Sequence, residues 1–299
     1  MAHDHIHKPS YNKAFALGIS LNLIYIVVEF VYGIIANSMA LIADAGHNLS
    51  DVLGLVLAWG ASYLASKSPT DKRTYGFRKS TVLASLTNAV ILLIAVGAIA
   101  FESIKRFAKP QVIESEIIIY VALIGVVINA FTAYLFFADH KRELNIKGAF
   151  LHMAADAAVS LGVVIAAVII RYTNYYWIDP VISLVIVLII TIGTWSLLKE
   201  SLNLSLDAVP KNINIDDVRN YLTKLDGVKN IHDLHIWAMS TTETALTVHL
   251  CKPNASYEDN FIETINSELK LKFEIDHATI QIETSENCND CSMNGQNNI

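Results

Sequence analysis

Two short segments place a histidine and an aspartate one helical turn apart inside strongly apolar sequence. The first is HNLSD, His47–Asp51, and the second is HMAAD, His152–Asp156. In an α-helix, residues i and i+4 point to the same side, with Cβ atoms about 5–6 Å apart. Each pair therefore offers a nitrogen and a carboxylate oxygen from one face. If the two helices pack together, four ligands converge, and zinc accepts such a set in tetrahedral geometry.

The apolar surroundings make these ionisable residues unfavourable unless they have a partner. An aspartate at the centre of a membrane helix costs about 2.5–3.5 kcal/mol on insertion scales. A single His-x-x-x-Asp pair is weak evidence, because a lone histidine in an apolar helix is usually a hydrogen-bonded core residue. Two copies favour a divalent cation, whose charge two carboxylates would neutralise. Small residues around both pairs permit close helix approach: Ala43, Ala45, Gly46, Ala154, Ala155 and Ala157.

Glu29 and Asp44 are two further acidic residues deep in apolar sequence. Asp44 lies one helical turn before His47, on the same stripe. Two roles are open for this acidic pair: a proton path, or hydrogen bonds to a polar neighbour such as Asn22 or Asn48. We favour the structural role.

The elements that carry these residues are predicted to be membrane-spanning helices. Of the 299 residues, 53% are hydrophobic and only 17% are charged, whereas soluble domains average about 25% charged residues. A span needs about 20 mostly apolar residues. Six segments qualify: about 14–36, 40–65, 80–101, 117–138, 148–170 and 178–198. The net charge of −6 argues against nucleic acid as a partner, and no signal peptide is expected.

The basic residues of the loops predict the orientation of these spans. Loops on the cytoplasmic side carry an excess of Lys and Arg. The loops after the second and fourth spans hold most of them, and the loop after the third is a mild exception. Both termini are therefore expected in the cytoplasm. The basic residues of the two rich loops are Lys67, Lys72, Arg73, Arg78 and Lys79, then Lys141, Arg142 and Lys147.

From about residue 207 the pattern becomes that of a small soluble domain. The spacing predicts helices over 213–228 and 256–271 and strands over 232–239, 244–251 and 277–283. This αββαβ order suits a two-layer α+β sandwich. We predict four parts: a His-rich cytoplasmic N-terminal segment (1–12), an all-α six-helix transmembrane domain (13–206), a cytoplasmic domain (207–285) and a disordered tail (286–299).

Five stretches resemble the cation diffusion facilitator family. They are SMALIADAGHNLSDVLGLVLAW, PTDKRTYGFRKSTVLASL, NIKGAFLHMAADAAVSLGVV, WIDPVISLVI and HDLHIW. The resemblance runs from about residue 12 to 285 and is strongest to zinc/cadmium/cobalt efflux proteins and to the vesicular zinc transporters of animals.

The resemblance implies a transporter and not an enzyme. It implies a homodimer in the lipid of a bacterial plasma membrane that exports Zn²⁺, with Cd²⁺ and Co²⁺ as alternatives, in exchange for protons. The implied transport ligands are His47, Asp51, His152 and Asp156. Manganese-type relatives have aspartate or asparagine instead of histidine, in keeping with imidazole as a zinc ligand. The rival interpretations are a membrane metal sensor and an intramembrane zinc enzyme.

In the tail domain, the resemblance implies a metallochaperone-like, ferredoxin-like fold that dimerises and binds zinc as a structural or regulatory ion. The implied ligands are His232, His249 and Glu283. Strand alternation places His249 and Glu283 on the polar face. His232 has the parity of the core residues, and alternation prefers His235. Both histidines remain open, and we keep His232 on the resemblance.

Other candidate metal ligands fall near the ends of the chain. They are His3, His5 and His7 at the N-terminus and the C-x-x-C pair Cys288 and Cys291. Some relatives have a histidine site in the loop after the second span, but here that loop has Arg73 and Phe77, so no site is expected there. The loop after the fourth span has His140 alone.

Overall fold

The computed structural model describes residues 11–137, 144–253 and 259–284. The chain forms two compact units. One contains the residues up to Val56 together with Asn88–Trp195, and the other contains Leu57–Thr87 together with the chain from Ser196 onward. Six residues that were considered above as possible metal ligands lie outside the described residues. They are His3, His5, His7, His140, Cys288 and Cys291.

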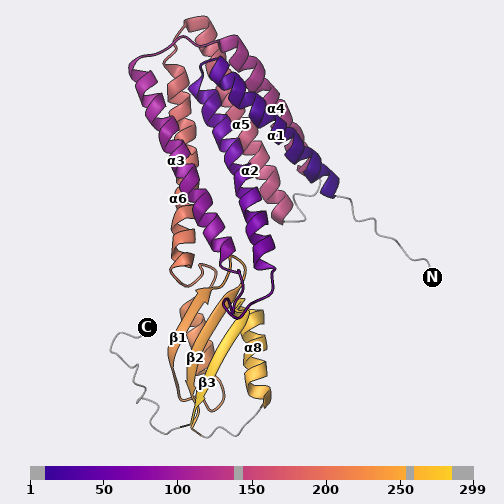
Figure 1. Cartoon of the computed structure of the whole chain (residues 1–299), viewed down its shortest axis with the longest axis vertical. Coiled ribbons are helices and arrows are strands. Elements are labelled where there is room, and N and C mark those ends of the chain that lie inside the picture. The colour runs from indigo at the N-terminus through magenta and orange to yellow at the C-terminus, as the bar shows by residue number, and fades with distance from the viewer. Residues whose placement is uncertain (1–10, 138–143, 254–258, 285–299) are drawn as a thin grey trace, which may run out of the picture. The chain divides into compact units, whose positions relative to one another are not determined.

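Six long helices account for the apolar segments (Figure 1). Within the described residues, five of them are long and apolar enough to cross a membrane, and the first contributes a shorter apolar stretch, Ser20–Ile35. The predicted helical membrane domain is therefore present, with five of its six spans meeting this criterion. The helices are α1 (Tyr11–Ile35), α2 (Met39–Ala65), α3 (Ser80–Ala108), α4 (Ser115–Phe137), α5 (Leu144–Thr173) and α6 (Ile178–Ser205).

A glycine lets α1 approach α4 closely. α4 packs against both α1 and α5. A Cβ atom at Gly125 of α4 would overlap the hydroxyl group of Tyr25. Because glycine leaves this space empty, the Tyr25 hydroxyl reaches between the helices and lies 3.4 Å from the Val121 carbonyl oxygen, to which it donates. Tyr25 is thereby held in the interior of the bundle.

A carboxylate from α6 caps the N-terminus of α2. The chain turns at Asn37, whose φ of 56° is left-handed. The Ser38 hydroxyl and the Met39 N–H then donate to Asp179 at 2.5 and 2.7 Å, and the Ala40 N–H donates at 3.4 Å. The first N–H groups of a helix have no partner within the helix, and a carboxylate there also faces the positive end of the helix dipole. Asp179 therefore joins α2 to α6.

Replacing Asp179 by alanine is expected to destabilise the helical unit by about 3 kcal/mol, because several buried donors would lose their acceptor. Thermal unfolding of the purified protein in detergent, followed by circular dichroism, would measure this. Asp71 lies in an exposed loop, so Asp71→Ala is the matched control and is expected to leave the midpoint unchanged. Equal midpoints for the two variants would show that the cap contributes nothing.

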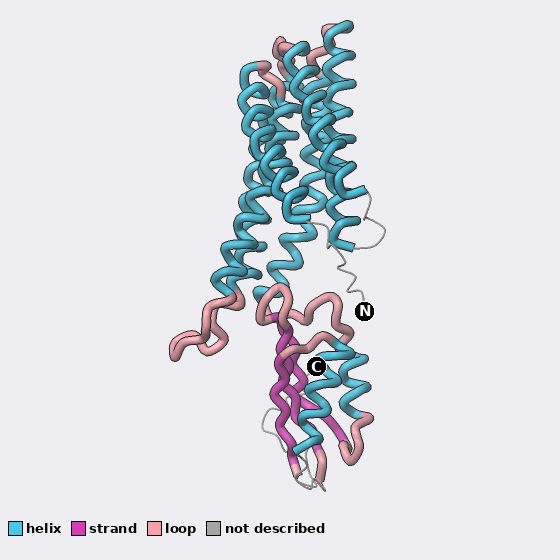
Figure 2. The backbone as a smooth tube through the Cα atoms, turned by 90° about the vertical axis from the view of Figure 1, so that its right-hand side faces the viewer, coloured by secondary structure: helices cyan, strands magenta, loops and turns pink. Residues whose placement is uncertain are grey.

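The second unit contains a three-stranded sheet with two helices (Figure 2). The strand order is β1-β2-β3, with β1 antiparallel and β3 parallel to β2. Figure 2 shows the sheet and the two helices as two layers, as the αββαβ order predicted. The elements are α7 (Ile215–Thr223), β1 (Asn230–Ala238), β2 (Thr244–Cys251), α8 (Asp259–Phe273) and β3 (His277–Glu283).

Alternation in β2 builds the core of this unit. Leu246, Val248 and Leu250 are fully buried and pack against Leu222 of α7 and Leu269 of α8. The intervening residues of β2 therefore lie on the opposite face of the sheet. The helix predicted over 213–228 is shorter, because the chain leaves α7 at its C-cap, Lys224, and turns at Gly227, whose φ is +73°.

Candidate metal sites

Side chains from α2 and α5 meet within the first unit. The His152 Nε2 atom lies 3.2 Å from Asp51 Oδ2 and 3.6 Å from Asp156 Oδ2. The His47 Nε2 atom lies 3.4 Å from Asp156 Oδ1. The two imidazole rings are 6.2 Å apart between centroids. The structure thus brings together the four residues whose spacing placed them on two helix faces. We call them the intramembrane cluster.

The intramembrane cluster is buried at one side and open at the other. The exposed fractions of the side chains are 3% for Asp156, 20% for His47, 36% for Asp51 and 43% for His152. Asp51, His152 and Asp156 each offer a ligand atom within 4.8 Å of the other two. His47 lies outside this group of three but contacts Asp156. Asp51 and His152 form the more exposed side of the intramembrane cluster.

The donor set of the intramembrane cluster suits a divalent cation. Two neutral imidazoles and two carboxylates carry a total charge of −2, and N and O ligands in a set of four are typical of zinc. Within the described residues, the buried Nδ1 atom of His47 has no hydrogen-bond partner. The interactions of the imidazole are thus concentrated at Nε2, the atom that points into the cluster. The four residues fit a cation without further ligands.

Glu29 and Asp44 lie beside the intramembrane cluster and are both fully buried. Tyr25 and Asn48 donate to the two Glu29 oxygens at 2.8 and 3.2 Å. Ser160 donates to Asp44 at 2.9 Å. Of the two predicted partners, Asn48 is therefore present, whereas Asn22 donates to the sulfur of Met153. Sequence reasoning missed Tyr25 and Ser160, although each lies four residues from an ionisable residue on its own helix.

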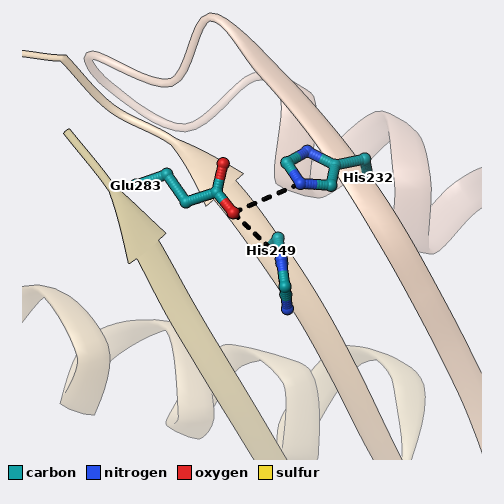
Figure 3. Close-up of side chains that lie close together, drawn as sticks. All are labelled: His232, His249 and Glu283. Atoms are coloured by element: carbon teal, nitrogen blue, oxygen red, sulfur yellow. Dashed lines mark hydrogen bonds and ion pairs between the residues drawn. The ribbon is translucent and has the colours of Figure 1, made fainter. Parts of the chain in front are cut away.

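A second cluster, the tail cluster, lies on the sheet of the second unit (Figure 3). It consists of His232 from β1, His249 from β2 and Glu283 from β3. The Glu283 Oε1 atom lies 3.3 Å from His232 Nε2 and 3.0 Å from His249 Nδ1. The three ligand atoms lie within 4.8 Å of one another, and the side chains are half-buried. Two nitrogens and one oxygen with this spacing form an incomplete tetrahedral set for zinc.

A β-bulge explains why strand alternation preferred His235. β1 pairs His232 with His249 but Ile236 with Leu246, so β1 has one residue more than β2 between these pairs. The extra residue reverses the alternation. Asp233 adopts a left-handed φ of 52° at this point. His232 therefore lies on the same face as His249, and the prediction from alternation is wrong at this strand.

Asp233 is a residue of this region that sequence reasoning missed. Its carboxylate lies 2.9 Å from His235 Nε2 and 3.6 Å from His249 Nε2. The His235 side chain is 63% exposed and turns to Asp233 instead of the tail cluster. A non-glycine residue such as aspartate adopts positive φ more readily than most. Asp233 thus forms the bulge and separates His235 from the tail cluster.

A family model described as the cation efflux transmembrane domain matches residues 15–204. The chain belongs to the cation efflux family. A second model, described as the cytoplasmic domain of cation efflux proteins, matches residues 210–285. The predicted membership of the cation diffusion facilitators is confirmed, and so is the expectation of a multi-pass membrane transporter of metal cations in place of an enzyme.

Relatives of this chain align over nearly its whole length. It is 35% identical to the metal cation efflux system protein CzcD of Cupriavidus metallidurans over 94% of this chain and 89% of the relative. It is 33% identical to a cadmium, cobalt and zinc/H⁺-K⁺ antiporter of Bacillus subtilis, over 94% and 92%. It is 32% identical to the zinc transporter ZitB of Escherichia coli, over 98% and 96%.

Proposed function

We propose that this protein exports Zn²⁺ from the cytoplasm, with Cd²⁺ and Co²⁺ as alternative substrates, in exchange for protons. The observation that carries the proposal is the meeting of two His–Asp pairs from α2 and α5 in one cluster. The names of the relatives support the choice of ion, because they include a zinc transporter and a cadmium, cobalt and zinc antiporter.

The chemistry of the intramembrane cluster explains how protons exchange for the metal. Zinc requires neutral imidazole and ionised carboxylate, so protons compete with it for the same four side chains. When the cluster faces the cytoplasm, Zn²⁺ binds and displaces protons. When the cluster faces the other side, protons rebind and release Zn²⁺. Metal affinity and proton affinity therefore oppose each other by linkage, and the proton gradient drives export.

Zinc uptake into everted membrane vesicles with an imposed pH gradient tests this function. An interior more acidic than the medium is expected to drive uptake, and collapse of the gradient by a protonophore is expected to stop it. A panel of Zn²⁺, Cd²⁺, Co²⁺ and Mn²⁺ would rank the substrates, with Mn²⁺ expected last because the cluster contains imidazole. Equal rates of uptake with and without the pH gradient would contradict proton exchange.

We further propose that both termini and the domain after α6 lie in the cytoplasm of a bacterial cell. The excess of basic residues in the loops after α2 and α4 supports this orientation, as does the description of the family model that matches residues 210–285. The same domain joins two copies of the chain in a homodimer, and the relatives are bacterial proteins.

The tail cluster is proposed to hold a zinc ion that stabilises the cytoplasmic domain. His232, His249 and Glu283 supply three ligands, and water or a further side chain supplies the fourth. Zinc bound to neutral histidines and a carboxylate from three different strands would hold the edges of the sheet together. This ion is distinct from the transported one.

Replacing His232 by alanine is expected to remove one bound zinc ion per chain, whereas His235→Ala is expected to leave the number unchanged. The reason is the β-bulge, which points His232 and not His235 toward Glu283. Metal analysis after gel filtration would count the ions, in a background with Asp51→Ala and Asp156→Ala so that the intramembrane cluster no longer contributes. Loss of zinc from His235→Ala with retention in His232→Ala would overturn this assignment.

A further inference from the structure

Glu29 of α1 and Asp44 of α2 form a carboxyl pair with no access to solvent. Both side chains are 0% exposed, and the two carboxyl groups lie close enough for a shared proton to form a hydrogen bond between them. Ser160 donates to one oxygen of Asp44. Within the described residues, the other oxygen, Oδ1, receives no hydrogen bond from an N–H or O–H donor. A buried oxygen without a donor points to a proton as its missing partner.

A contact between two carboxyl groups requires a proton between them. Both groups offer only acceptor oxygens when ionised, so two carboxylates side by side in a buried site repel each other and cannot both keep their charge. One shared proton converts the repulsion into a hydrogen bond. The donors from Tyr25 and Asn48 orient Glu29, and the donor from Ser160 orients Asp44, so the pair is built to hold one proton and one negative charge.

We propose that the Glu29–Asp44 pair is a proton-binding site separate from the metal ligands: it holds one proton when the intramembrane cluster is empty and releases it when a divalent cation binds there. The O–H bond of the shared proton breaks, the pair keeps both electrons, and the proton passes to solvent. This inference rests on the proposed function of the intramembrane cluster and extends it, since it adds a proton that no metal ligand carries.

The position of the pair beside the cluster supplies the coupling. Asp44 lies one turn before His47 on α2, and its donor Ser160 lies one turn after Asp156 on α5. The charge of a divalent cation in the cluster is poorly screened in the protein interior. It therefore favours the form of the pair in which both carboxyl groups are ionised. The titratable groups that act on the pair are Tyr25 from α1, His47 from α2 and Asp156 from α5. α4 contributes the Val121 carbonyl oxygen, which accepts from Tyr25.

Proton release on zinc binding to the full-length protein in detergent tests the pair. In a weakly buffered solution with a pH indicator and saturating zinc, Glu29→Gln is expected to release about one proton fewer per chain than the natural protein. Glutamine keeps the shape of the protonated acid and has no carboxyl proton to release. Glu116 is an exposed residue in the first turn of α4, so Glu116→Gln is the matched control and is expected to change nothing.

Infrared difference spectroscopy gives a second measurement that does not require a variant to bind zinc. Zinc added to the natural protein is expected to remove the C=O band of a protonated carboxyl group, and this loss is expected to be absent from Glu29→Gln and from Asp44→Asn. If the natural protein loses no such band, or if Glu29→Gln binds zinc and releases as many protons as Glu116→Gln, the pair is not a proton site.

Two further variants separate this proposal from the proposed function. If Asp51→Ala with Asp156→Ala leaves zinc binding and proton release unchanged, the proposed transport site is wrong, and the proposal for the pair falls with it. If that double variant loses zinc binding while Glu29→Gln keeps both zinc binding and full proton release, only the proposal for the pair is overturned. Zinc in the tail cluster contributes equally to all these proteins and cancels in the comparison.

Discussion

Replacing Asp156 by asparagine is expected to reduce zinc transport to the level of vesicles without the protein. Asp156 is the buried member of the intramembrane cluster and contacts both His47 and His152. Asparagine keeps the shape but removes one of the two negative charges. A Zn²⁺ ion would then leave a net charge of +1 in a buried site. Loss of one partner from a buried ionic contact costs about 3–5 kcal/mol, which is roughly 10²- to 10⁴-fold in affinity.

The initial rate of zinc uptake into everted vesicles, normalised to the amount of protein, measures this effect. Asp71→Asn makes the same chemical change in an exposed loop and is expected to transport at the rate of the natural protein. A rate for Asp156→Asn within a few-fold of the Asp71→Asn rate would mean that zinc does not depend on the charge of Asp156, and the four-residue site would have to be abandoned.

The long helices and the domain order were predictable because they depend on local pattern. A continuous apolar run of about 20 residues crosses a membrane as a helix, because a helix hydrogen-bonds the backbone groups of the run to one another. In the second unit, the alternation of Leu246, Val248 and Leu250 identified β2 with the bounds that the structure shows. The convergence of His47 with Asp156 followed from an i, i+4 spacing on two helices, once these helices were assumed to pack together.

The features that the sequence did not predict depend on tertiary contacts. The bulge at Asp233 inserts one residue into β1, and only pairing with β2 reveals it. The cap that Asp179 supplies to α2 joins residues about 140 positions apart in the chain, so no local signal marks it. The contact between Tyr25 and Glu29 has a local signal in its i, i+4 spacing, but its burial depends on Gly125 of another helix.

Removing zinc from the cytoplasmic domain is expected to speed the exchange of its core amide hydrogens about 100-fold. The tail cluster draws one ligand from each strand of the sheet, so an ion there binds the folded sheet and not the unfolded chain. At a free zinc concentration of 100 times the dissociation constant, such an ion stabilises the fold by about 2.7 kcal/mol. Amides that exchange only through opening of the whole domain respond to the full amount.

Hydrogen exchange of the full-length protein in detergent, with zinc or with a chelator, would measure this effect in peptides that cover β1 and β2. Glu283→Gln is expected to remove most of the zinc-dependent protection, because Glu283 contacts both histidines and supplies the only negative charge of the tail cluster. His235→Ala, which changes an exposed histidine on the same strand, is expected to keep that protection. Equal protection in Glu283→Gln and His235→Ala would show that the ion is held elsewhere, and the role of the three strands in binding it would be refuted.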